Sequence, residues 1–120
     1  MVASLPNDRG VRRGQIFWVD FDPSRGSEQA GLRPALVVQN DVGNRYSPNT
    51  VVAAMTTKLG DKAYPTEVRL SDELFGKPGV VLCSQILTVG QERLGSSAVA
   101  QLDEATMARV DAALRLSLAL

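Results

Sequence analysis

Two side chains suited to phosphate chemistry, Arg33 and Thr56, lie at the ends of predicted β-strands. Ala35–Val38 is an unbroken apolar run, typical of a strand that is buried on both faces. Pro34 fits the first position of that strand, where no ladder N–H is needed. If this strand pairs antiparallel with the strand predicted at Thr50–Thr57, Arg33 and Thr56 lie on the same rim of the sheet. A guanidinium binds a phosphate through two parallel hydrogen bonds and a hydroxyl can donate to a phosphate oxygen, so the pair indicates a phosphate site.

The segment Gly26–Arg33 is polar and contains glycine, so we expect it to be a loop. It carries Ser27, Glu28 and Gln29 just before the predicted strand. A hydroxyl, a carboxylate, an amide and a cation held at a rigid strand boundary are a common basis for a binding or catalytic site. The alternative is a purely structural ion pair between Arg33 and Glu28.

The carboxylates offer a second kind of site. Asp20 and Asp22 lie two residues apart on a predicted strand, so they share a face and are candidate ligands for a divalent cation together with Asp41 or Glu28. This spacing is common, and solvated charges at a strand end are the simpler interpretation. The chain has no histidine, which excludes Ser–His and Cys–His nucleophiles, paired-histidine cleavage of RNA and histidine-ligated metals.

The composition is that of one domain spanning residues 1–120. Of its residues, 44% are apolar and 22% are charged, and the net charge is zero, so the chain can bury a core but shows no overall attraction to nucleic acid. Its apolar runs are too short to span a membrane, and the N-terminus lacks the apolar segment of a signal peptide. The single cysteine, Cys83, lies in an apolar run, and we expect a buried, unreactive thiol in a cytoplasmic protein.

The elements that must position these residues are mostly short strands. Strands are predicted at 15–22, 35–38, 50–57 and 66–70, with a long or bent strand over 79–89. We expect loops over 40–49 and 59–65, one helical turn within 71–78, and a poorly ordered terminus over 1–13. In the first strand Phe17, Val19 and Phe21 should face the core, with Trp18 and Asp20 on a second surface.

The last segment is predicted to be a helix. Asp103 is a fair N-cap, and Glu104 adds favourable negative charge to the first turn. Its apolar stripe consists of Met107, Val110, Leu114 and Leu118. Five or six short strands followed by one helix predict a mainly β fold, either a small barrel or a strongly bent antiparallel sheet with a C-terminal helix packed on it.

From Arg13 to its end, the chain resembles the MazF/PemK family of toxin endoribonucleases, the toxic half of type II toxin–antitoxin pairs. The Gram-positive type of the family is the most similar. The most specific stretches are 13–23, 26–34 and 39–41. Further similar stretches are 44–45, 47–48, 53–56, 110–111 and 116–120.

The resemblance implies an SH3-like barrel, a homodimer and an mRNA interferase that causes growth arrest. Such an enzyme cuts single-stranded RNA at a short sequence, without metal or other cofactor. The ribose 2′-hydroxyl attacks the adjacent phosphate, leaving a 2′,3′-cyclic phosphate and a 5′-hydroxyl. The resemblance also implies an acidic, MazE-like antitoxin as partner, and no membrane partner.

The family's catalytic arginine and threonine fall on Arg33 and Thr56. Its substrate-binding positions fall on Ser27, Glu28, Gln29, Thr57 and Gln85. Ser84 stands where some relatives carry an acidic residue, so this chain departs from their pattern beside Gln85.

Two alternatives remain at this stage. A non-enzymatic, gyrase-binding toxin of the CcdB type would share the fold, but such toxins use a tryptophan close to the C-terminus, and Leu116–Leu120 contains none. A metal nuclease would use Asp20, Asp22 and Asp41.

Overall fold

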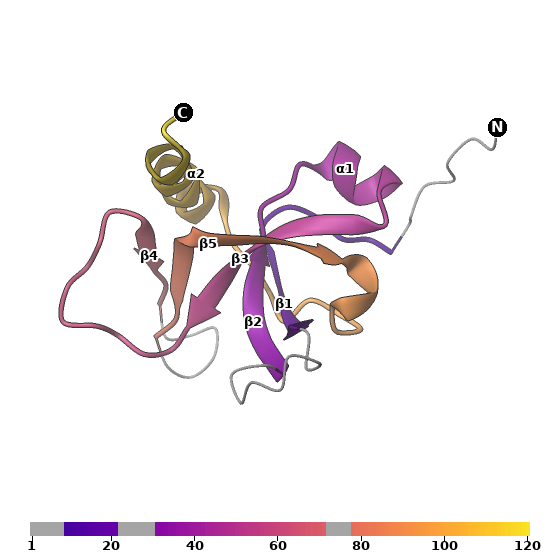
Figure 1. The fold of residues 1–120 in the computed structure, drawn as a ribbon, viewed down its shortest axis with the longest axis horizontal. Coiled ribbons are helices and arrows are strands. Elements are labelled where there is room, and N and C mark those ends of the chain that lie inside the picture. The colour runs from indigo at the N-terminus through magenta and orange to yellow at the C-terminus, as the bar shows by residue number, and fades with distance from the viewer. Residues whose placement is uncertain (1–8, 22–30, 72–77) are drawn as a thin grey trace.

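The computed structural model describes residues 9–21, 31–71 and 78–120, which form a bent, six-stranded antiparallel sheet with helices on one side of it (Figure 1). The order of strands across the sheet is β4-β5-β3-β2-β1-β6. The elements are β1 (Gln15–Phe21), β2 (Gly31–Val37), α1 (Asp41–Tyr46), β3 (Asn49–Thr56), β4 (Glu67–Arg69), β5 (Val80–Gly90), the 3₁₀-helix η2 (Gln91–Arg93), β6 (Ala100–Gln101) and α2 (Glu104–Leu118). The predicted mainly β fold with a C-terminal helix is confirmed.

The sheet buries both of its faces, which explains why its central strands are apolar at successive positions. One core lies between the sheet and α2; Ile16, Leu36, Met55 and Val110 belong to it. The other core lies on the opposite face and includes Phe17, Val19, Ala35, Val37 and Val52. Phe17 and Val19 are therefore buried as predicted.

Trp18, which alternates with these core residues along β1, is 42% exposed, in agreement with the predicted second surface.

The bend of the sheet is concentrated in β5. Along the β3–β5 ladder, Ala53 pairs with Ile86 but Ala54 pairs with Leu82, so three residues of β5 have no partner on β3. Extra residues on one strand of a pair make a bulge, which bends the strand and increases its twist. Figure 1 shows β5 turning sharply, and the sheet closes into a half-barrel.

Helix α2 begins and ends with specific caps. Asp103 is the N-cap, as predicted, and its side chain accepts a hydrogen bond of 2.8 Å from the backbone N–H of Thr106. Hydrogen bonds from the side chain and the backbone of Thr106 lower the pKa of Asp103. Within the predicted stripe, Val110 is buried, but Leu118 is 53% exposed. The core therefore covers α2 as far as Leu114 but not its last residues.

Residues 40–49 were predicted to be a loop, and this is wrong for 41–46, which form α1. Asn40 caps the helix by accepting a bond of 2.7 Å from the Gly43 N–H. Asn44 is completely buried; its amide donates to the Gln39 carbonyl and to Asp41, and its oxygen accepts from the Thr50 hydroxyl at 2.6 Å. The turn-forming side chains of this segment hydrogen-bond to one another and to the nearby backbone. The segment therefore forms a short helix and is not a solvent-exposed loop.

Residues 9–13 belong to the stretch predicted to be poorly ordered, but in the structure they pack against the domain. Val11 is buried in the core that faces away from α2. Arg13 forms an ion pair of 2.6 Å with Asp111 of α2, and its backbone N–H donates to Asp41. The buried side chain of Val11 and the ion pair of Arg13 hold this segment against the domain. The rest of the predicted terminus, 1–8, lies outside the described residues.

In the part of the chain that the structure describes, no helix has the length and apolar character needed to cross a membrane.

Candidate active site

Arg33 lies in β2, which begins at Gly31, three residues before the strand start predicted at Pro34. Gly31 has a φ of +123°, a conformation that residues with a side chain rarely adopt, and it starts the strand. Arg33 then pairs with Val19 of β1, and its side chain is exposed. The prediction that Gly31–Arg33 is loop is therefore wrong, while the arginine is held more firmly than a loop residue would be.

Arg33 and Thr56 lie on the same face and at the same end of the sheet. Ala35 pairs with Ala54 across β2 and β3, and residues directly opposite in an antiparallel ladder share a face. Arg33 is two residues before Ala35, and Thr56 is two residues after Ala54, so both alternate onto that face. Figure 1 shows the start of β2 and the end of β3 on the side of the sheet away from the helices.

The sheet divides at this end. Among the described residues, the β2–β3 ladder stops at Ala35 and Ala54. Beyond it, β2 stays paired with β1 through Val19 and Arg33, whereas β3 stays paired with β5 through Thr56 and Val80. Two strand pairs thus diverge, with the guanidinium of Arg33 on one and the hydroxyl of Thr56 on the other.

The Thr56 hydroxyl is oriented by the turn that follows it. The backbone N–H of Lys58 donates to the Thr56 Oγ1 at 3.1 Å. A hydroxyl oxygen that accepts such a bond keeps its own proton to donate elsewhere. Thr56 is half-buried and Thr57 is exposed, so the hydroxyl proton of Thr56 is available to an anion at the surface.

Gln85 is exposed in the bulged part of β5, between Leu82 and Ile86, whose partners on β3 are consecutive residues. This places it near the Ala53–Ala54 step, which comes before Thr56 along β3. Ser84 beside it is exposed as well. The bulge explains why a strand with a buried apolar run presents two polar side chains in succession.

Ser27, Glu28 and Gln29 lie outside the described residues, as does Asp22. Their predicted roles, and the alternative ion pair between Arg33 and Glu28, stay predictions.

The described residues give little support to a metal site. No group of three or more His, Cys, Asp or Glu side chains within 9–21, 31–71 and 78–120 is placed to hold a metal ion. Asp41 instead accepts hydrogen bonds from the backbone of Arg13 at 2.7 Å and from Asn44 at 3.1 Å. Its carboxylate thus joins the start of α1 to the N-terminal segment.

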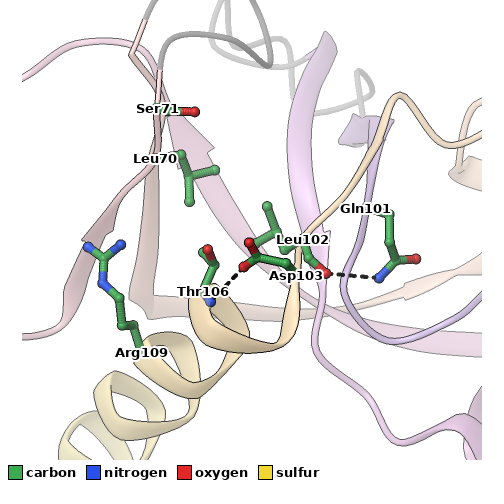
Figure 2. Close-up of a pocket in the computed structure, with 7 residues that line it drawn as sticks. All are labelled: Leu70, Ser71, Gln101, Leu102, Asp103, Thr106 and Arg109. Atoms are coloured by element: carbon green, nitrogen blue, oxygen red, sulfur yellow. Dashed lines mark hydrogen bonds between the residues drawn. The ribbon is translucent and has the colours of Figure 1, made fainter.

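Two pockets lined by described residues lie away from this rim, beside α2. The pocket in Figure 2, of about 330 Å³, lies at the N-terminus of α2. There Asp103 is engaged as the helix cap and Arg109 donates to the carbonyl of Arg69 at 3.2 Å. The second, of about 340 Å³, lies at the C-terminal end of α2, beside Arg13 and Leu118.

The class of protein is shown by a match to a known family. Residues 12–118 match the family described as PemK-like, MazF-like toxin of type II toxin–antitoxin system. The chain belongs to this family.

Individual relatives are also similar to this chain over most of its length. The chain is 43% identical over 112 residues to the endoribonuclease EndoA of Bacillus subtilis (strain 168), covering 92% of this chain and 96% of EndoA. A MazE–MazF crystal structure from Deinococcus radiodurans matches with a TM-score of 0.76 and 29% identity, over 92% of this chain and 96% of that one. A mycobacterial endoribonuclease in complex with its cognate antitoxin matches with a TM-score of 0.75 and 27% identity, with the same coverage. The resemblance found in the sequence is thereby confirmed.

Proposed function

We propose that this chain is the toxin of a toxin–antitoxin pair and cuts single-stranded RNA without a metal ion. The observation that carries the proposal is the position of Arg33 and Thr56 on one face of the sheet, where two strand pairs diverge. The identity with the endoribonuclease EndoA supports it.

In the proposed reaction, the ribose 2′-oxygen loses its proton and bonds to the adjacent phosphorus, while the bond from phosphorus to the 5′-oxygen breaks and that oxygen takes up a proton. The products are a 2′,3′-cyclic phosphate and a 5′-hydroxyl. Negative charge develops on the non-bridging oxygens, and stabilising it is the main catalytic task of the protein. Arg33 supplies a positive charge there, and the Thr56 hydroxyl donates to one oxygen. Because an arginine side chain stays protonated in proteins, Arg33 suits charge stabilisation better than proton abstraction.

Readout of the RNA sequence is assigned to Ser27, Glu28, Gln29, Thr57 and Gln85, through bases that are splayed out, stacked and hydrogen-bonded. Glu28 is the carboxylate best placed in the sequence to act as a base.

A homodimer in the cytoplasm and an acidic antitoxin that orders on binding complete the proposal. The Deinococcus and mycobacterial complexes support the antitoxin. Leu118 and Leu120, 53% and 85% exposed at the end of α2, are apolar surface that contact with another protein would cover.

The test is cleavage of a long single-stranded RNA by Arg33→Ala. We expect a loss of at least about 100-fold in rate, the scale seen when one stabilising donor is removed from a transition state. Arg109→Ala, which removes an exposed arginine of α2, should cleave normally. Circular dichroism checks that both variants are folded.

Three further results would distinguish the alternatives. A substrate with a 2′-deoxy sugar on the 5′ side of the cut should survive, since its nucleophile is absent. Full activity of Arg33→Ala would contradict the assignment of that residue. An inert wild-type chain that inhibits supercoiling by gyrase would support the CcdB-type alternative.

A further inference from the structure

Lys58 is an exposed cation whose backbone, unlike that of an ordinary loop residue, is anchored at the candidate active site. Its N–H donates to the Thr56 Oγ1 at 3.1 Å. Since the N–Cα bond adds about 1.5 Å, the α-carbon of Lys58 lies within about 4.6 Å of that hydroxyl oxygen. The side chain therefore starts beside the candidate phosphate-binding hydroxyl, whatever rotamer it adopts.

The charge of Lys58 is not neutralised within the described structure. The ion pair there joins Arg13 to Asp111, at the other side of the domain, and no described carboxylate pairs with Lys58. Lys58 is exposed, as are its neighbours Thr57 and Leu59. An unpaired lysine on a flexible stem is a point charge suited to a phosphate group.

Two of the described cations, Arg33 and Lys58, come from different strand pairs at this end of the sheet. Arg33 lies on the β1–β2 side of the divergence, and Lys58 follows Thr56 on the β3–β5 side. A single RNA strand carries one negative charge per nucleotide. A strand that places its scissile phosphate between Arg33 and Thr56 brings a neighbouring phosphate within reach of a second cation.

We propose that Lys58 binds the RNA backbone phosphate next to the scissile one, and so positions the substrate without reading its sequence. The proposal rests on the ribonuclease function proposed above and adds a residue to it. Contacts to phosphate fix the register of a nucleic acid but carry no base information. Loss of the Lys58 charge should therefore weaken binding equally for all sequences.

The test compares Lys58→Gln with Lys58→Arg and with Lys62→Gln, a matched control in the same exposed segment. The substrate is a labelled single-stranded oligonucleotide that carries the cut site mapped by sequencing the 5′ ends of a long-RNA digest. For Lys58→Gln we expect KM to rise roughly two- to fivefold, the effect of one exposed ion pair, while kcat changes less than KM.

The charge of Lys58 should also affect how RNA binding depends on the salt concentration. With a non-cleavable oligonucleotide, 2′-deoxy at the cut, the slope of log Kd against log [KCl] should fall by about 0.7 for Lys58→Gln, the value for one phosphate contact on a single strand. Lys58→Arg should restore the slope and KM, Lys62→Gln should match wild type, and the mapped cut sequence should stay the same in every variant.

An unchanged KM and salt slope in Lys58→Gln, with wild type active and Arg33→Ala inactive, would overturn this inference and leave the proposed function standing. A shifted cut sequence, or failure of Lys58→Arg to restore binding, would also overturn it, because a charge contact to phosphate would then not be the cause. Absence of RNA cleavage by wild type would refute the proposed function itself, and the inference with it.

Discussion

Cys83 shows how far one side chain can be predicted from its neighbours. The sequence places it in an apolar run, and in the structure it is fully buried in the core beside α2. Burial raises the pKa of its thiol from 9.0 to about 11, because the thiolate loses its hydration in an apolar surrounding. Since the thiolate is the reactive form, the residue should be inert at neutral pH.

We predict that native protein reacts slowly with Ellman's reagent from neutral pH to about pH 9, because the thiol is both buried and protonated there. The measurement is the rate at which the Cys83 thiol reacts with the reagent, with and without denaturant. Unfolded chain should react completely and quickly. Rapid stoichiometric labelling of the native protein would contradict the burial of Cys83.

The orientation of the Thr56 hydroxyl depends on a partner two residues away. That partner could not be predicted from residue types. Its hydroxyl accepts from the Lys58 N–H, which occurs only because β3 ends at Thr56 and the chain turns at once. The sequence marked Thr56 as a candidate donor. The orientation of that donor follows from the turn.

At the scale of elements, α1 is held by a buried polar network. Asn44, Thr50 and Gln91 are all at most 1% exposed. Gln91 donates to the carbonyls of Asn44 and Ser47 at 2.8 and 3.1 Å, so η2 is joined to the end of α1. Buried polar groups of this kind stabilise a fold only when nearly all their hydrogen bonds are made.

We predict that Asn44→Ala lowers the free energy of unfolding by about 2–3 kcal/mol, since the Thr50 hydroxyl keeps its burial but loses its acceptor. Denaturant unfolding followed by circular dichroism measures it. Asn49→Ala is the matched control because Asn49 is exposed, and it should change stability little. Equal effects of the two substitutions would show that the network contributes nothing.

At the scale of the whole molecule, the divergence of two strand pairs sets the proposed chemistry. It exposes a guanidinium and a hydroxyl on one face, without a cluster of carboxylates among the described residues. A positive side chain can do the charge stabilisation that a cation does in metal nucleases. In the proposed reaction, Arg33 supplies this charge in place of a divalent ion.

We predict that excess EDTA changes the rate of RNA cleavage by less than about twofold, because Arg33 supplies the charge at the phosphate. The measurement is the initial rate on one RNA before and after chelation. Added Mg²⁺ serves as the control and should also have little effect. Loss of activity in EDTA and its return with Mg²⁺ would instead favour the site at Asp20, Asp22 and Asp41.

The sequence by itself determined the features that depend on short-range patterns. The strand at Gln15–Phe21, the buried run within Ala35–Val38, the cap at Asp103 and the burial of Cys83 follow from residue types a few positions apart. The family resemblance rests on such local stretches too. Alternation and capping are local because they follow from the geometry of a single strand or helix turn.

Only the tertiary structure decided the features that require contacts between distant segments. Helix α1 exists because Asn44 is buried against Thr50 and Gln91, and residues 9–13 are fixed because Arg13 meets Asp111, 98 residues away. The bulge in β5 and the parting of β2 from β3 likewise depend on ladder register. Register is a property of two strands together, so neither strand's sequence reveals that Arg33 and Thr56 face the same side where the sheet divides.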